Sequence, residues 1–190
     1  QEAVEIDSVV FFQADDGKTG WELWKSDGTA SGTVIVKDIE PGIGSSDPRQ
    51  LTASNGILYF IANDGNNGVE LWRSNGSAAG TVMVKDIRSG STGSFPSSLI
   101  DVSGTVFFIA NDGVNGNELW KSDGTTSGTV LVQDIWPGSS GFAGEPAAVS
   151  GTVFFRANDS VNGYELWKSD GTATGTTMVK DIFPGSSGGF

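Results

Sequence analysis

Short runs of apolar residues alternate with glycine-rich turns along the whole chain, and the second quarter shows the pattern well. Ile57 to Ala62 is a run of β-branched and aromatic residues with the length of a buried strand. A loop NDGNNG follows, then VELWRS from Val69 to Ser74, the turn NGSAAG, and TVMVKDI from Thr81 to Ile87. With the weaker segment from Leu51, this predicts four short strands joined by hairpins. No segment has apolar residues at helical spacing, so essentially no helix is expected.

The same pattern occurs four times. The string ELW starts at Glu22, Glu70, Glu118 and Glu165, so successive copies are 48, 48 and 47 residues apart. The single change in length falls in a connection, where a lost residue is tolerated. A period of this size predicts a repeat architecture in which each copy is one small sheet. We expect one repeat domain over residues 1–190, with units at about 1–50, 51–98, 99–145 and 146–190.

The strands within each copy are apolar on both faces. Val106 to Ala110, VFFIA, is apolar at every position rather than at alternate ones, as in strands that are covered on both sides. Stacking the copies face to face provides that cover. The sequence therefore predicts an all-β protein, a β-propeller with four blades, each a four-stranded antiparallel meander. A parallel β-solenoid is the main alternative, and a β-sandwich gives no reason for such close repetition.

The number of blades in a closed ring is left open by the sequence. Four copies could close alone, two chains could complete a ring of eight, or the chain could be part of a longer protein. The first strand is expected near Ala3 and the last ends near Ile182, so no strand remains to join the two ends of a ring. An open set of four blades exposes two apolar faces. We therefore expect self-assembly, or a piece of a longer chain, rather than a solitary four-bladed ring.

One long string carries a family resemblance. The pattern E-L-W-x-x-D-G-T-x-x-G-T-x-x-V-x-D-I-x-P-G stands almost intact from Glu22 to Gly42 and resembles the bacterial ELWxxDGT repeat family. One motif occurs in each copy; the departures are Asn75, Ser77 and Ser89. The resemblance implies an exported bacterial repeat protein of propeller type, extracellular or on the cell surface, with its signal peptide removed. Most functions in that family are unassigned, so the resemblance supplies no chemistry.

Composition narrows the function classes. The chain has 23 acidic and 11 basic residues and a formal charge of −12, which disfavours nucleic acid and anionic lipid as partners. No apolar run is long enough for membrane insertion. Cysteine and histidine are both absent, which excludes thiol chemistry, disulfides and a Ser-His-Asp triad. We therefore expect a protein that is not an enzyme and needs no cofactor, and we rank an enzyme that uses carboxylates last.

Residues present in every copy are best explained by the scaffold. The tryptophans of the ELW strings are expected between blades. The recurrent glutamates, the basic residues after each tryptophan and the aspartates of the fourth strands are expected to form inter-blade salt bridges and turn anchors, and the SDGT aspartates to form turns. A second set of aspartates stands in glycine and asparagine loops whose oxygens could hold Ca²⁺, although the spacing is not that of an EF-hand and a plain hairpin loop is the alternative: Asp16, Asp64, Asp112 and Asp159.

Residues that differ between copies are better candidates for recognition. They concentrate in the connection between the second and third strands and in the link to the next copy, which should open on the same side of each blade. Six aromatic residues lie there: Trp21, Phe95, Trp136, Phe142, Tyr164 and Phe183. Aromatic platforms beside Asn, Asp and Ser are typical of sugar-binding surfaces. These aromatics could instead cover blade junctions or form a protein interface.

These observations predict a non-enzymatic, extracellular β-propeller module for binding or assembly. Carbohydrate is the first ligand to consider, and a protein partner is the other. The alternative is a purely structural subunit that assembles through its blade edges into larger rings or polymers.

Overall fold

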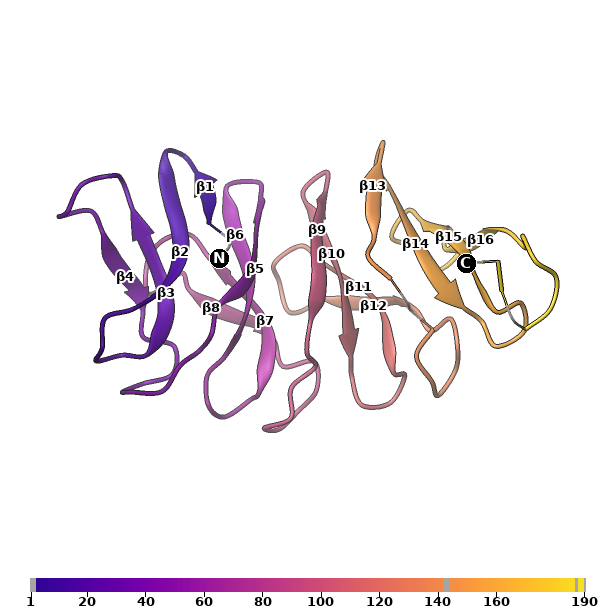
Figure 1. Cartoon of the computed structure of the whole chain (residues 1–190), viewed down its shortest axis with the longest axis horizontal. Coiled ribbons are helices and arrows are strands. Elements are labelled where there is room, and N and C mark those ends of the chain that lie inside the picture. The colour runs from indigo at the N-terminus through magenta and orange to yellow at the C-terminus, as the bar shows by residue number, and fades with distance from the viewer. Residues whose placement is uncertain (1–2, 142–143, 187, 190) are drawn as a thin grey trace. The chain divides into compact units, whose positions relative to one another are not determined.

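The computed structural model describes residues 3–141, 144–186 and 188–189, and these residues form sixteen β-strands (Figure 1). The first two sheets contain β1 (Val4–Ile6), β2 (Val9–Asp15), β3 (Trp21–Ser26), β4 (Val34–Lys37), β5 (Arg49–Ser54), β6 (Ile57–Asn63), β7 (Val69–Ser74) and β8 (Val82–Lys85). The other two contain β9 (Ser97–Val102), β10 (Thr105–Asn111), β11 (Asn117–Ser122), β12 (Val130–Gln133), β13 (Ala147–Val149), β14 (Thr152–Asn158), β15 (Tyr164–Ser169) and β16 (Thr177–Lys180).

The predicted all-β architecture is confirmed. Each sheet pairs its four strands in sequence order and antiparallel, as a meander does, and the described residues contain no helix. None of the described segments is therefore a helix of the length and apolarity that crossing a membrane requires. We call the four sheets the first to fourth blades. Two blades begin two residues earlier than expected, because β5 starts at Arg49 and β9 at Ser97.

The fourth strand of each blade is shorter than its apolar pattern suggests. β8 ends at Lys85, although the pattern continues to Ile87. The reason is a change of hydrogen-bond partner, because the amide of Arg88 donates to the Glu70 carboxylate instead of to a neighbouring strand. The pairing between third and fourth strands also shifts register, as between Leu71 and Trp72. A β-bulge of this kind bends the strand and increases its twist.

The chain divides into two compact units, residues 1–99 and 100–190, and each has its own core. In the first unit the first and second blades pack face to face. The contributing residues include Phe11, Leu23 and Val36 from the first blade and Leu58, Phe60 and Trp72 from the second. These side chains are almost fully buried, and burial of apolar surface at about 25 cal/mol per Å² is what holds the two sheets together.

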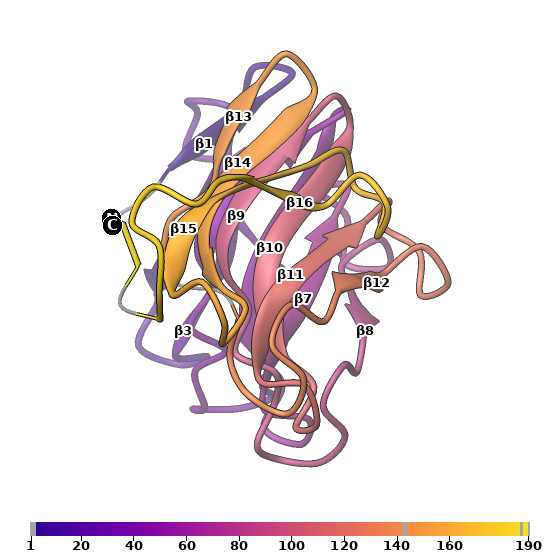
Figure 2. The same cartoon turned by 90° about the vertical axis from the view of Figure 1, so that its right-hand side faces the viewer.

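The second unit repeats this arrangement with the third and fourth blades. In Figure 2 the sheet of β13–β16 lies in front of the sheet of β9–β12. The shared core includes Phe107, Leu119 and Val132 from the third blade and Val153, Phe155 and Trp167 from the fourth. The matching residues in the two units occupy matching positions of the repeat. One sequence pattern therefore generates one kind of junction between blades.

Candidate functional site

A buried glutamate holds the link between blades in place. Glu22 lies on β3 and has no exposed surface. Its Oε2 accepts hydrogen bonds from the Ser46 hydroxyl at 2.6 Å and the Ile39 amide at 3.0 Å, and Oε1 accepts from the Ser46 amide at 3.1 Å and the Glu40 amide at 3.3 Å. Four donors satisfy this carboxylate. Both ends of the link that follows β4 are thereby fixed to β3.

The other blades reuse this anchor. Glu70 accepts from the Ser94 hydroxyl at 2.5 Å and from the Ser94 amide at 2.8 Å. Glu165 accepts from the amides of Ile182 and Phe183 at 3.2 and 3.4 Å. The expectation of inter-blade salt bridges is therefore wrong for these glutamates, and the expectation of turn anchors is right. Amide donors suit a buried carboxylate because they bring no second charge that must also be desolvated.

The third blade has an incomplete anchor. Gly141 stands where the first two blades have serine, so the hydroxyl donor is missing, and Glu118 Oε1 accepts from the Gly141 amide at 2.7 Å. Glu118 Oε2 is buried and makes no hydrogen bond to a described residue. Burial raises the pKa of Glu118 to about 7; the amides of Gly141, Ile135 and Trp136 oppose this, and the nearby charge of Asp134 adds to it. Burial also raises the pKa of Glu22, but there the Ser46 hydroxyl opposes it most.

The anchored link lies beside the start of the third strand. The Trp21 amide donates to Ser45 Oγ at 3.0 Å, and the Asp47 amide donates to the Trp21 carbonyl at 3.2 Å. The same contact recurs in the second blade, where the Phe95 amide donates to the Val69 carbonyl at 3.1 Å. The two variable connections thus adjoin on one side of the blade, as the sequence analysis expected.

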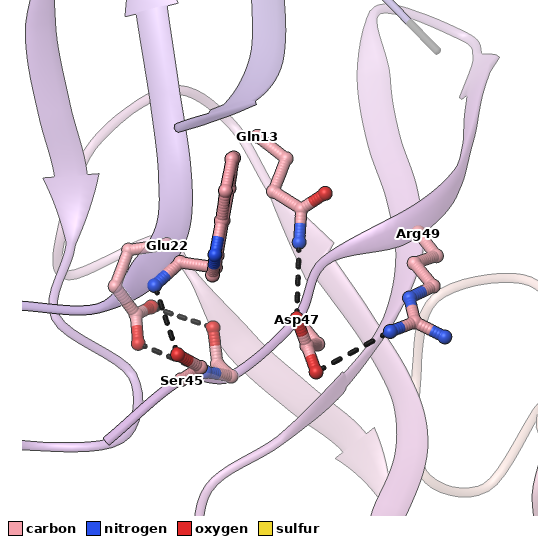
Figure 3. A network of polar contacts seen from close by, with 7 residues as sticks. Gln13, Glu22, Ser45, Asp47 and Arg49 are labelled. Carbon is pink, nitrogen blue, oxygen red and sulfur yellow. Dashed lines mark hydrogen bonds and ion pairs between the residues drawn. The ribbon is translucent and has the colours of Figure 1, made fainter. Parts of the chain in front are cut away.

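In the first unit this side carries a polar network next to an exposed tryptophan. Trp21 is 41% exposed. Gln13 Nε2 donates to Asp47 Oδ1 at 3.2 Å, and Arg49 Nη2 lies 3.3 Å from Asp47 Oδ2 (Figure 3). A cavity of about 120 Å³ adjoins them, lined by Ser45, Asp47, Arg49 and Asn63 among others. We name Gln13, Trp21, Asp47 and Arg49 the link site.

Sequence reasoning found only Trp21 of these four residues. Gln13 lies on a strand that is otherwise apolar, and the other blades have Ile61, Ile109 and Arg156 at its position. That departure from the repeat is the signal that could have identified it. Asp47 and Arg49 follow the anchored serine, and β5 begins at Arg49, two residues before the apolar segment that starts at Leu51.

The remaining predicted aromatics fall into two sets. Phe95 is exposed and belongs to the first unit with Trp21. In the second unit Phe183 is exposed, Trp136 is partly buried, and Tyr164 is partly buried with the Arg156 guanidinium 4.3 Å from its ring centre. Such stacking stabilises the pair, and it covers part of the ring. Phe142 lies outside the described residues.

The aspartates considered for calcium serve their own loops. Asp64 Oδ1 accepts from the amides of Asn66 and Asn67, and Asp64 Oδ2 accepts from Asn67 Nδ2 at 2.7 Å. Asp112 and Asp159 repeat the pattern. In Asp16 the amides of Thr19 and Lys18 lower the pKa. These are Asx turns, and no cluster of three or more acidic side chains that could hold a metal ion occurs in the ranges that the structure describes. Calcium binding stays a prediction.

Comparison with known proteins identifies the fold. No family model and no curated protein sequence matches the chain. Among solved structures, puromycin hydrolase matches with a TM-score of 0.59 and 14% identity over 96% of this chain and 30% of its own. Oligopeptidase B from Leishmania major matches with a TM-score of 0.55 and 14% identity, over 93% of this chain and 26% of its own. The computationally designed Ika8 protein matches with a TM-score of 0.50 and 18% identity, over 98% of this chain and 49% of its own.

The blades and these likenesses together define the class: the chain is an all-β repeat protein made of four β-propeller blades. It spans less than half of each of these three structures. At such low identity the likeness describes the fold alone. The activities named for the two hydrolytic enzymes belong to those proteins.

Proposed function

We propose that this chain is a non-enzymatic, extracellular propeller module for binding and assembly, with carbohydrate bound at the link site. The observation that carries the proposal is the exposed Trp21, whose carbonyl accepts from the Asp47 amide, together with the Asp47 carboxylate that contacts Gln13 and Arg49. A flat apolar ring supports the C–H face of a sugar, while amide, carboxylate and guanidinium groups meet its hydroxyls. The carboxylate of Asp47 is held on both sides by Gln13 and Arg49, which fixes these groups before a ligand arrives.

The non-enzymatic part of the proposal rests on residue chemistry. The chain lacks cysteine and histidine, the residues most used as nucleophile and general base. Its recurrent glutamates are buried and their oxygens are directed to backbone amides. A glycosidase would need a paired acid and nucleophile at an open site. Asp47, the carboxylate of the link site, is instead paired with a guanidinium.

A glycan array with matched variants tests the carbohydrate proposal. Gln13→Ile installs the residue that the second and third blades have at that position, so the scaffold is expected to tolerate it. We expect Trp21→Ala and Gln13→Ile each to lower the array signal at least tenfold. Trp136→Ala examines the other unit, and Val114→Ala, in an exposed loop, is the control. An array that stays silent with the unaltered chain, or variants that bind as the unaltered chain does, would reject the proposal.

The second candidate function is a purely structural subunit. The observation that favours it is the unusual exposure of apolar residues on the first and fourth blades, such as Val10, Val179 and Ile182. Persistent oligomers together with a silent glycan array would support this role over carbohydrate binding.

A further inference from the structure

The junction between blades has two different sides, which we call the outgoing and the incoming face. The outgoing face of the first blade presents Phe11, Lys25 and Lys37. Lys25 Nζ donates to the Gly76 carbonyl of the second blade at 2.7 Å, and Lys37 Nζ donates to the Thr81 carbonyl at 2.8 Å. The Phe11 ring packs on Gly76. The incoming face of the second blade thus supplies an apolar surface and two carbonyl acceptors.

The second unit builds the same junction. Phe107 and Lys121, at the positions of Phe11 and Lys25, pack on Gly171, which stands at the position of Gly76. Hydrogen bonds from Thr172 and, to a smaller extent, the charge of Lys121 lower the pKa of Asp170 in the same turn. Two junctions of one design therefore exist within the chain, and both join an outgoing face to an incoming face.

The fourth blade carries an outgoing face that the chain leaves open. Val179 is 46% exposed, whereas its counterparts Val36 and Val132 are 5% and 6% exposed. Ile182 is 51% exposed, whereas its counterparts Ile39 and Ile135 are buried. Lys168 and Lys180 stand where Lys25 and Lys37 make their junction hydrogen bonds. This face has the apolar residues and the two donors of a junction.

The first blade carries an open incoming face. Val10 is 38% exposed, whereas its counterparts Leu58 and Val153 have no exposed surface. Thr33 is exposed, although Thr81 is buried. No atom lies within contact distance of the position that a Cβ on Gly28 would take, whereas Gly76 and Gly171 each meet a phenylalanine ring there. The two open faces are the two halves of the junction that the chain builds twice.

We propose that the outgoing face of the fourth blade packs on the incoming face of the first blade in a second copy of this chain, with Lys168 donating to the Gly28 carbonyl and Lys180 to the Thr33 carbonyl. The contact is head to tail, and it closes when both copies make it. Two copies supply eight blades, the upper end of the range in which propellers close. Asp27, beside Gly28, would face Lys168 as Asp170 faces Lys121. The inference deepens the assembly role of the proposed function and does not depend on carbohydrate binding.

Sedimentation of the 190-residue chain over a range of concentrations tests the inference. We expect a dimer of twice 19.7 kDa. Val10→Asp and Val179→Asp place a charge on one face each, so each alone should give monomers. Ile43→Asp and Val161→Asp, at exposed loop positions in the same units, should leave the dimer intact. Circular dichroism confirms that every variant is folded. A monomer at all concentrations would overturn the inference, as would a dimer that only one of the two face variants disrupts.

A mixing experiment tests the polarity of the contact. A Val10→Asp chain keeps its outgoing face and a Val179→Asp chain keeps its incoming face. Mixing the two monomers should restore one junction and produce a heterodimer, which neither alone can form. A mixture that stays monomeric would contradict a head-to-tail contact. Because the chain has no cysteine, Lys180→Cys in one copy and Thr33→Cys in the other can be joined by a short bismaleimide. We expect cross-linked pairs at the proposed junction, and their absence from a sedimenting dimer would place the contact elsewhere.

Discussion

The second glycine of each turn motif (Gly32, Gly80, Gly128 and Gly175) is explained by the Asp or Asn side chain beside it. In the second blade Asn75 Oδ1 accepts hydrogen bonds from the Ser77 amide at 3.0 Å and the Ser77 hydroxyl at 2.7 Å. Gly80 closes this turn, and a Cβ at that position would overlap the Asn75 side chain. The backbone of Gly80 does not require positive φ. Glycine is therefore needed here for space rather than for conformational freedom.

Gly80→Ala should lower the free energy of unfolding by about 1–3 kcal/mol, the usual cost of forcing an extra methyl into a packed site. Urea unfolding measures the change. In an Asn75→Ala background the obstructing side chain is gone, so the same substitution should cost much less. Equal costs in the two backgrounds would show that the two side chains are not coupled.

Glu118 should give the protein a specific pH dependence. Its pKa is about 7 in the folded chain, above the usual 4.5 of an exposed glutamate. The folded state therefore binds this proton more tightly, and the stability that it contributes is full below pH 4.5 and is lost as pH rises through 7. The total effect is up to about 3 kcal/mol.

Glu118→Gln removes this titration and keeps the shape of the side chain. We expect the free energy of unfolding of the unaltered chain, relative to the variant, to fall between pH 5 and pH 8. Urea unfolding at the two pH values measures the difference. Glu22 and Glu70 are present in both proteins, so their contributions to the pH dependence cancel in the difference. A difference between the two proteins that stays constant with pH would contradict the assignment.

At the scale of the blade, the lysine after the ELW tryptophan lies at a junction in one blade and on an open face in another. Lys25 donates its hydrogen bond across a junction, whereas Lys168 is at the same position on an open face. Junction stability therefore comes from the context of the blade and not from the residue type. The two positions form a natural pair for comparison.

Lys25→Ala should lower the free energy of unfolding by about 1–2 kcal/mol, because a charge-assisted hydrogen bond and its packing are lost. Lys168→Ala is the matched control and should cost almost nothing when measured in monomeric Val179→Asp protein. Thermal or urea unfolding of the two lysine variants, each beside its parent protein, measures both costs. Equal losses at the two positions would mean that Lys25 acts within its own blade.

The strands could be predicted well because each is a short run of apolar residues bounded by glycine-rich turns, which is visible in the local sequence. VELWRS gives β7 at the residues expected, and the apolar runs give the second strand of each blade. The site could be predicted less well. Glu22 reads as a charged residue on a strand, and its neighbours in sequence do not reveal that amides from residue 39 onward will surround it. Contacts of this kind depend on how the link folds back, which periodicity does not encode.

At the scale of the whole molecule, assembly should make stability depend on concentration. Anything that binds the folded state alone stabilises it by mass action, and a second copy is such a ligand. We expect the melting temperature to rise with protein concentration in the unaltered chain and to stay constant in Val179→Asp. Differential scanning fluorimetry over a hundredfold dilution measures this. A melting temperature that does not change with protein concentration in either protein would contradict assembly.

The glutamate anchor has a consequence for how this protein can diversify. In the first two links it acts through backbone amides and one serine hydroxyl, so exposed side chains of the first link such as Ile43 make none of these anchor bonds. The corresponding segments already differ among the four copies. The link sequence can therefore vary between copies while the glutamate stays in place. Replacing the other residues of the first link by a foreign sequence, with Gly42, Ser45 and Ser46 retained, should change what the surface recognises without changing the fold.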